Sequence, residues 1–214
     1  DQPRSRGLGD VYKRQYQSCS AFAGNPYFVD LEALEKEGLL TAADLKAESW
    51  GKDPLEVDYG TLYVSRFAVL RKAYAAWRSQ CAGLHGCSYY YPDDYYAFTL
   101  ANEDWLEDYA LFMAVKAEQG QAGLADWPDA LRCREPEVIA AAKVRLADQI
   151  SYHKAVQFFF YTQWNALKAY ANGKGIQLVG DIPIYVSPDS SDLWTRPELF
   201  QTDGQTHLTQ VAGC

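Results

Sequence analysis

Asp181 is the residue whose place in the sequence points most clearly to chemistry. It directly follows residues 176–180, a short and mostly apolar run flanked by Gly175 and Gly180, which predicts a buried parallel β-strand. In α/β barrels the functional groups lie at the carboxyl ends of the strands, so we expect this carboxylate at a functional edge, with Pro183 restraining the backbone beside it. The same spacing also fits an aspartate that only caps the loop or the next helix.

Tyr16 and Gln17 form a second candidate site, in a serine-rich loop near the start of the chain. A tyrosine ring can cover the apolar face of a sugar, and a glutamine amide can hydrogen-bond its hydroxyl groups. Aromatic residues make up 14% of the chain, and we expect most of them in the core. The pair is therefore compatible with a sugar-binding loop but does not define one.

Other polar residues favour structural roles. Asp104, Glu107 and Asp108 fall on the polar side of a predicted helix, which favours a solvated face. His153 lies inside a long predicted helix and is interpreted as a packed or surface residue rather than a general base. No nucleophile elbow, phosphate-binding loop or dinucleotide fingerprint occurs in a suitable context, so no cofactor is predicted.

The cysteines do not form a recognisable metal site. Cys81, His85 and Cys87 could be three ligands on one loop, but a fourth is missing and the spacing matches no common zinc pattern, so no metal is predicted. The five cysteines are an odd and scattered set, which favours free thiols in a reducing compartment. We therefore expect a cytoplasmic location.

The composition of the 214 residues is that of a globular protein, with 48% hydrophobic and 22% charged residues. The net charge of −8 leaves no basic field to neutralise phosphates, which argues against nucleic acid as a partner. The longest apolar runs are far shorter than the roughly 20 residues of a membrane span, so we expect a soluble protein with no membrane partner.

Periodicity predicts a mainly helical stretch followed by a change of period. Helices are predicted at 31–40, 58–80 and 103–118, and at 137–170 as one long helix or two abutting ones. A further short helix is predicted to open with a capping box at Thr41–Asp44. Within 58–80, apolar residues recur at steps of four and three: Tyr63, Phe67, Leu70, Tyr74 and Trp77. A connector is expected at 83–94 and a glycine stop at 172–175. A helix followed at once by a buried strand is typical of an α/β fold.

Several motifs resemble, in order, those of the 4-α-glucanotransferases (amylomaltase or disproportionating enzyme, glycoside hydrolase family 77). They are Tyr-Gln-Ser at 16–18, Ser-Ala-Phe-Ala-Gly-Asn-Pro at 20–26, Trp-Leu-Glu-Asp-Tyr-Ala-Leu-Phe-Met at 105–113, Gln-Trp at 163–164, Tyr-Ala-Asn at 170–172 and Gly-Asp-Ile-Pro-Ile-Tyr-Val at 180–186. Cys19 stands where the family has a proline or another small residue.

The resemblance implies a fragment of a (β/α)8 TIM barrel with a large, mainly helical insertion. On this reading residues 16–30 are an active-site loop at the barrel edge, 31–170 are the insertion, and 171–214 hold barrel strand three and the loop after it. Asp181 resembles the family's aspartate beside the sugar in the reactive subsite, and Tyr16 its active-site tyrosine. Gln17 and Pro183 are expected to line the same cleft.

The resemblance also implies an activity for the complete enzyme. Such an enzyme transfers part of an α-1,4-glucan to the 4-hydroxyl of another glucan or glucose, with a nucleophilic carboxylate and an acid/base carboxylate about 5 Å apart. In the family both belong to strands that follow position 214. The chain as printed is therefore expected to be inactive by itself and to contain no catalytic residue.

Residues 1–15 differ in character from the rest. They lack a periodic apolar face, and residues 5–15 can be back-translated in frame into a sequencing-adapter end. We interpret this stretch as an artefact of cloning or assembly that has no relation to the fold behind it.

Two alternatives share much of this pattern. An α-glucan hydrolase of the same clan would have the barrel and the aspartate after strand three, and a non-catalytic glucan-binding module would fit a chain without the nucleophile. The motifs at 20–26 and 105–113 together favour the transferase.

Overall fold

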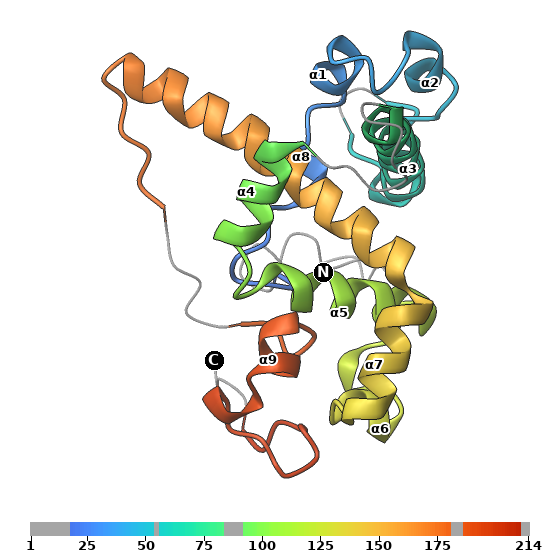
Figure 1. The fold of residues 1–214 in the computed structure, drawn as a ribbon, viewed down its shortest axis with the longest axis vertical. Helices are drawn as coiled ribbons and strands as arrows, with labels where there is room; N and C mark the ends of the chain where they lie inside the picture. Colours follow the sequence, from blue (N-terminus) through green and yellow to red (C-terminus); the bar gives the residue numbers. More distant parts are fainter. Residues whose placement is uncertain (1–17, 54–55, 84–91, 181–185, 211–214) are drawn as a thin grey trace. The chain divides into compact units, whose positions relative to one another are not determined.

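The computed structural model describes residues 18–53, 56–83, 92–180 and 186–210, and these are mainly helical (Figure 1). In chain order the helices are η2 Pro26–Phe28, α1 Leu31–Lys36, α2 Ala42–Lys46, α3 Tyr59–Gly83, α4 Asp93–Ala101, α5 Leu106–Glu118, η3 Leu124–Asp126, α6 Asp129–Arg132, α7 Pro136–Arg145, α8 Ala147–Gly173, α9 Ser191–Thr195 and η4 Pro197–Leu199.

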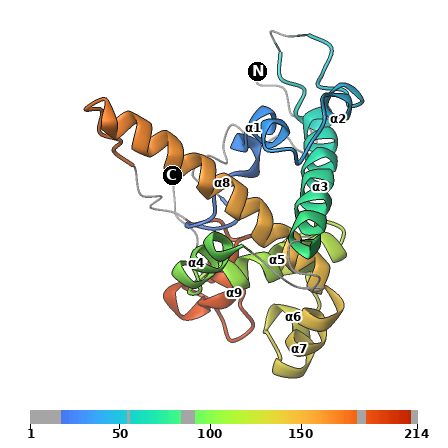
Figure 2. The same cartoon turned by 45° about the horizontal axis from the view of Figure 1, so that its top comes forward.

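The chain divides into two compact units. Unit 1 contains Gly24–Ala101 and Ala155–Ile176, and unit 2 contains Asn102–Lys154 together with the described residues up to Ala23 and from Gln177 onwards. Helix α8, the long yellow-to-orange helix of Figures 1 and 2, therefore begins in unit 2 and continues through unit 1.

The local helix-start predictions in unit 1 are confirmed. The Thr41 hydroxyl accepts from the Asp44 N–H at 3.2 Å, and the Asp44 carboxylate accepts from the Thr41 N–H at 3.0 Å, which completes the capping box of α2. At the start of α3, Asp58 accepts from both the N–H and the hydroxyl of Thr61. Short polar side chains thus satisfy donors that a helix start leaves free.

The predicted apolar stripe of α3 belongs to the core of unit 1. Leu70, Tyr74 and Trp77 are buried, and the Trp77 ring contacts the rings of Phe158 and Phe159 on α8 at centroid distances of 6.1 and 5.9 Å. The spacing of four and three brings these side chains onto one face of the helix, so the core of this unit follows from the sequence pattern.

The long helical stretch resolves into two abutting helices, α7 and α8. Leu146 lies between them, and its N–H still donates to the carbonyl of Ala142 at 2.8 Å. Helix α8 ends as predicted: Gly175 has φ +77°, in the left-handed region, and the Ile176 N–H returns to the carbonyl of Ala171 at 3.0 Å.

The structure departs from the sequence prediction at two places. Helix α4 begins at Asp93, inside the predicted connector 83–94, and continues to Ala101, where no helix was predicted. Pro92 followed by two aspartates fits a helix start as well as a turn. Residues 176–180 were predicted as a buried strand, but they form no strand and Val179 is 93% exposed. A parallel strand is stable only with a neighbour and covered faces, and the described residues supply neither.

Three aromatic rings form the centre of unit 2. Phe112, Trp127 and Trp194 contact one another at centroid distances of 5.2, 5.8 and 5.5 Å, and all three are buried. The Trp194 indole N–H donates to the Leu131 carbonyl at 2.9 Å, and the Arg134 guanidinium lies 4.3 Å from the centroid of the Trp194 ring. These contacts hold α9, and with it the loop before α9, against α5.

In the part of the chain that the structure describes, no helix is both long and apolar enough to cross a membrane. The same part contains no cluster of three or more histidine, cysteine, aspartate or glutamate side chains placed to hold a metal ion.

Candidate functional site

The four predicted site residues, Tyr16, Gln17, Asp181 and Pro183, lie outside the described residues, so the structure gives no geometry for them. The segments that follow each pair are described. Residues 18–23 come after Gln17, and residues 186–192 come after Pro183.

These two following segments are hydrogen-bonded to each other in unit 2. The Ser191 N–H and hydroxyl both donate to the Cys19 carbonyl, at 2.8 and 3.1 Å. The Ala21 N–H donates to a carboxylate oxygen of Asp192 at 2.9 Å. The chain segments next to both predicted pairs therefore meet, although they are 171 and 172 residues apart in sequence.

The first segment is a tight turn organised by Ser20. This residue is 3% exposed, and its hydroxyl accepts from the N–H groups of Phe22 and Ala23 at 3.1 and 3.3 Å. The Phe22 ring stacks on Trp105, which directly precedes α5, with centroids 6.3 Å apart. The Ser20 hydroxyl stabilises the turn, because it accepts from two backbone N–H groups of the turn.

The second segment is fixed by Asp189 and Ser190. The Asp189 carboxylate binds the buried Lys116 ammonium of α5 at 2.5 Å and accepts from the Leu124 N–H at 3.1 Å. Ser190 is fully buried and caps α9 by accepting from the Leu193 N–H at 3.2 Å. A charge-assisted contact and a helix cap thus anchor the loop that follows the predicted Asp181 site.

Asp192 is the carboxylate that joins the two segments. Burial raises the pKa of its carboxyl group, and the hydrogen bond from the Ala21 N–H works in the opposite direction. The Asp192 backbone N–H acts in the same direction as that of Ala21, but together they do not offset the loss of hydration. The hydrogen bond from Ala21 indicates that Asp192 helps to hold the two segments together.

The two acidic residues in the first turn of α5 are ion-paired. Asp108 binds Arg134 at 2.7 Å, and Glu107 contacts Lys143 at 3.9 Å and also Lys154. The side chains of Glu107 and Asp108 are 41% and 36% exposed, so the predicted solvated face is present but carries surface ion pairs.

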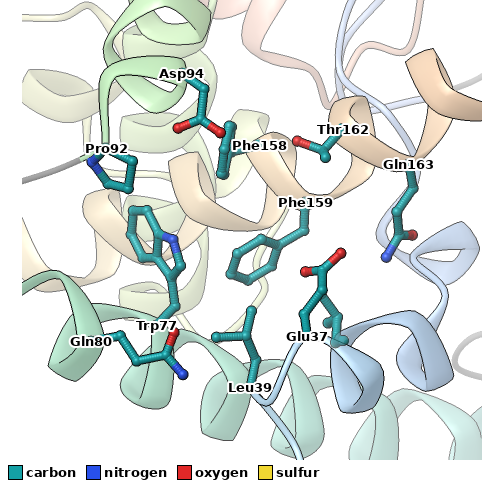
Figure 3. Close-up of a pocket in the computed structure, with 11 residues that line it drawn as sticks. Glu37, Leu39, Trp77, Gln80, Pro92, Asp94, Phe158, Phe159, Thr162 and Gln163 are labelled. Carbon is teal, nitrogen blue, oxygen red and sulfur yellow. The ribbon is translucent and has the colours of Figure 1, made fainter.

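Unit 1 contains a cavity that the sequence analysis did not predict (Figure 3). It measures about 310 Å³. Its buried lining is apolar, and its exposed lining is polar; the lining residues are Leu34, Glu37, Leu39, Trp77, Gln80, Pro92, Asp94, Phe158, Phe159, Thr162 and Gln163. Trp77 was recognised only as part of a core stripe, and residues from four helical regions meet here, so no local signal could have found the cavity.

Two glutamines of α8 hold the chain segment that leads into α1. The Gln157 amide is bonded to the N–H and C=O of Gly24 at 2.8 and 2.9 Å. The Gln163 amide is bonded to the N–H and C=O of Asp30 at 2.7 and 3.0 Å. Both pairs imitate the two-bond pairing of adjacent β-strand residues, and each spans 133 residues of sequence.

Comparison with known proteins agrees with these motifs. The family model described as 4-alpha-glucanotransferase matches residues 10–214. A 4-alpha-glucanotransferase of Streptococcus pneumoniae is 42% identical over 200 residues, which are 93% of this chain and 38% of that protein. The corresponding protein of Thermus thermophilus is 39% identical over 210 residues, 97% of this chain and 39% of that protein.

A solved structure gives the same result. An amylomaltase from Streptococcus agalactiae, determined in complex with acarbose, matches with a TM-score of 0.80 and 41% identity, over 89% of this chain and 37% of that one. The chain spans well under half the length of the relatives it matches. With residues 10–214 matched throughout, the chain belongs to the 4-alpha-glucanotransferase family, glycoside hydrolase family 77.

Proposed function

We propose that the protein containing this chain is a 4-alpha-glucanotransferase that passes an α-1,4-glucan segment to the 4-hydroxyl of another glucan or of glucose. The observation that carries the proposal is the family match over residues 10–214. The 42% identity to a relative named for this activity supports it. The chain supplies only part of the length of those relatives, so the activity is assigned to the longer protein.

We propose a (β/α)8 barrel as the fold of that longer protein, with residues 31–170 as a helical insertion. The helices of this range and the likeness to an amylomaltase structure support the proposal. Residues 176–180 would then form a barrel strand whose neighbours come from other parts of the protein. Their high exposure in the described structure is what an unpartnered barrel strand should show.

Within that barrel, Tyr16, Gln17, Asp181 and Pro183 are proposed to line the glucan cleft. The hydrogen bonds between Cys19 and Ser191 support this grouping, because they join the segments that follow the two pairs. Asp181 is proposed to accept hydrogen bonds from the sugar in the reactive subsite. The nucleophile and the acid/base are expected on later strands, about 5 Å apart, as a retaining double displacement requires.

The substrate is proposed to be a malto-oligosaccharide, both as donor and as acceptor. The complex of the Streptococcus agalactiae amylomaltase with acarbose supports a saccharide ligand for this chain's cleft. The proposed chemistry uses carboxylates alone, so no cofactor or metal is required. The cytoplasmic location stays a prediction.

The product pattern on maltotriose tests the proposal. The gene is expressed with the coding sequence that adjoins this chain, and the products are separated by size. Maltodextrins both longer and shorter than the substrate are expected. Release of reducing sugar without longer products would mean an α-glucan hydrolase, and binding without any product would mean a glucan-binding module. The chain as printed, incubated alone, is expected to form no product.

A further inference from the structure

Lys116 is a charged residue in the last turn of α5, and its side chain is only 10% exposed. Its ammonium group donates to the Ala122 carbonyl at 3.1 Å and to a carboxylate oxygen of Asp189 at 2.5 Å. A lysine is rarely buried unless it is paired, because removing an ammonium group from water is costly. The chemistry proposed above does not use Lys116, so its burial has another reason.

The turn after α5 completes the contact. Gln121 has φ +67°, in the left-handed region, and its N–H returns to the Lys116 carbonyl at 2.8 Å. The chain then brings the Ala122 carbonyl to the Lys116 ammonium, and the Leu124 N–H to the second oxygen of Asp189 at 3.1 Å. Both carboxylate oxygens of Asp189 are therefore bonded to α5 and its turn, which fixes the orientation of the carboxylate as well as its place.

Asp189 in turn holds the chain next to a predicted site residue. Its N–H donates to the hydroxyl of Ser187 at 3.1 Å, and Ser187 is buried. Only a short stretch of chain separates Ser187 from Asp181, and Pro183 lies within it. Because the proline ring fixes one backbone torsion, few torsions are left to absorb a shift of Asp189 before it reaches Asp181.

The same anchor bears on the segment after the other predicted pair. The Ser191 N–H and hydroxyl both donate to the carbonyl of Cys19. Ser190, between Asp189 and Ser191, is fully buried and caps α9, which lies against α5 in Figures 1 and 2. The loop 187–191 is therefore held by α5 on one side and bonded to the segment 18–23 on the other.

Stability alone is a weak reason for this ion pair. Apolar side chains of similar volume often replace a buried ion pair with no loss of stability, and sometimes with a gain. The ring contacts of Phe112, Trp127 and Trp194 already hold α9 against α5 without any charge. A hydrogen-bonded charge pair adds a defined distance and direction, which ring contacts do not supply.

We infer that Lys116 is a positioning residue for glucan transfer: it holds Asp189, and so fixes the loop after residues 176–180 and keeps Asp181 in the reactive subsite. The role in transfer rests on the proposed function, whereas the anchoring of the loop does not. Lys116 acts through the loop and is assigned no contact with the glucan. Helix α5, from the helical range 31–170, thus contributes to the geometry of the proposed barrel site.

Hydrogen exchange in the longer protein tests the anchoring. Lys116→Met keeps the length of the side chain and removes the ammonium group. Peptides that cover 187–192 are expected to exchange about tenfold faster in this variant, because the loop opens more often. Arg145→Met is the matched control: it removes the more exposed ion pair between Glu118 of α5 and Arg145, and should leave this exchange as in the parent. Unchanged exchange in Lys116→Met would overturn the inference, whatever the activity of the protein.

Initial rates on maltotriose test the transfer role. Lys116→Met is expected to lower kcat about ten- to a hundredfold, because a misplacement of about 1 Å can cost that much. KM should stay within about twofold, since the charge of Asp181 matters most in the transition state. Arg145→Met should keep the parent kcat.

The Asp181→Asn background separates positioning from a general loss of structure. If Lys116 acts by placing the Asp181 carboxylate, Lys116→Met should lower kcat by less than about twofold once that carboxylate is gone. A loss from Lys116→Met that is as large in the Asp181→Asn background as in the parent would mean a merely structural role and would refute the inference.

A double variant covers the case in which Lys116→Met folds poorly. Lys116→Met combined with Asp189→Asn leaves neither charge unpaired and keeps an oxygen for the Leu124 N–H. We expect it to regain most of the parent's thermal stability but not its kcat. A stable double variant with the parent kcat would contradict the positioning role.

The two possible failures are distinguishable. Absence of longer maltodextrins from the parent itself would refute the proposed function, and with it the transfer role of Lys116. Transfer by the parent at a rate that Lys116→Met does not change would refute the positioning role alone.

Discussion

Gln157 holds Gly24 through both polar groups of the glycine backbone. Its side-chain oxygen accepts from the Gly24 N–H at 2.8 Å, and its side-chain nitrogen donates to the Gly24 carbonyl at 2.9 Å. Gln157 is fully buried, so its amide depends on this partner. The contact joins α8 to the start of the segment that leads into α1, and it requires the chain to come very close to the helix.

Gly24→Ala tests this close approach. A Cβ atom on Gly24 would lie 2.0 Å from the Phe160 ring, far inside van der Waals contact. We expect the substitution to lower the free energy of unfolding of unit 1 by about 1–3 kcal/mol, because ring and backbone must both shift. Urea unfolding followed by circular dichroism measures it. Gly173→Ala is the control, since nothing lies within 4 Å of its added methyl group; equal loss in both variants would contradict the steric argument.

Gln157→Ala tests the amide pair itself. It leaves the N–H and C=O of Gly24 without their partner next to a buried site, which we expect to lower the free energy of unfolding by about 2 kcal/mol. Gln163→Ala removes the same kind of pair from Asp30, but Asp30 is exposed and water can replace the amide. The expected loss there is under about 1 kcal/mol. A larger effect at Gln163 than at Gln157 would show that burial does not set the strength of these pairs.

Asp192→Asn tests the charge at the junction of the two segments. Burial raises the pKa of Asp192 in the folded state, so the proton-bound form is favoured by folding and stability is lost as the pH rises through the folded pKa. An asparagine oxygen can keep the hydrogen bond from the Ala21 N–H without the charge. We therefore expect the variant to be more stable than the parent at neutral pH, with the difference shrinking as the pH falls toward about 3.9, the ordinary Asp value.

Asp203→Asn is the control, because the pKa of Asp203 is shifted in the opposite direction to that of Asp192. Hydrogen bonds from the His207 N–H and from other nearby donors lower the pKa of Asp203, so its ionised form favours folding. Its stabilisation is present above the unfolded pKa and is lost as the pH falls through the lowered value. Thermal unfolding across the acid range should show the two differences moving in opposite directions. Parallel curves would contradict the assignment of burial as the cause at Asp192.

The contrast between what could and could not be predicted follows the range of the interactions. The stripe on α3 and the capping box at Thr41 were predictable because each pattern is set by residues no more than four positions apart along the chain. Helix α4 was missed because Pro92 and the aspartates after it fit two local structures equally well. The Gln157–Gly24 pair and the cavity around Trp77 join residues far apart in sequence. The spacing of residues around a glutamine or a tryptophan does not indicate which distant residue it will contact.

The strand at 176–180 illustrates a different limit. Its composition fits a buried strand, but burial depends on neighbours that the described residues do not contain, and Val179 is exposed instead. The candidate site has the same limit. Tyr16 and Asp181 were selected from the sequence, and the structure describes the segments that follow them. Ser191 and Asp192 join these two segments by hydrogen bonds.

Asp181→Asn in the longer protein tests the proposed cleft. A retaining transfer passes through a positively charged sugar, and a carboxylate beside it stabilises that charge by more than it stabilises the bound substrate. Groups that stabilise developing charge contribute on the order of 3 kcal/mol, so we expect kcat on maltotriose to fall by about a hundredfold or more. KM should change little, because an asparagine keeps the shape and one acceptor oxygen. Asp104→Asn, at an exposed position before α5, is the matched control and should transfer at the parent rate. Near-parent turnover of Asp181→Asn would return this aspartate to a capping role at the end of the strand, and the search for the charge-stabilising group would move to the later strands.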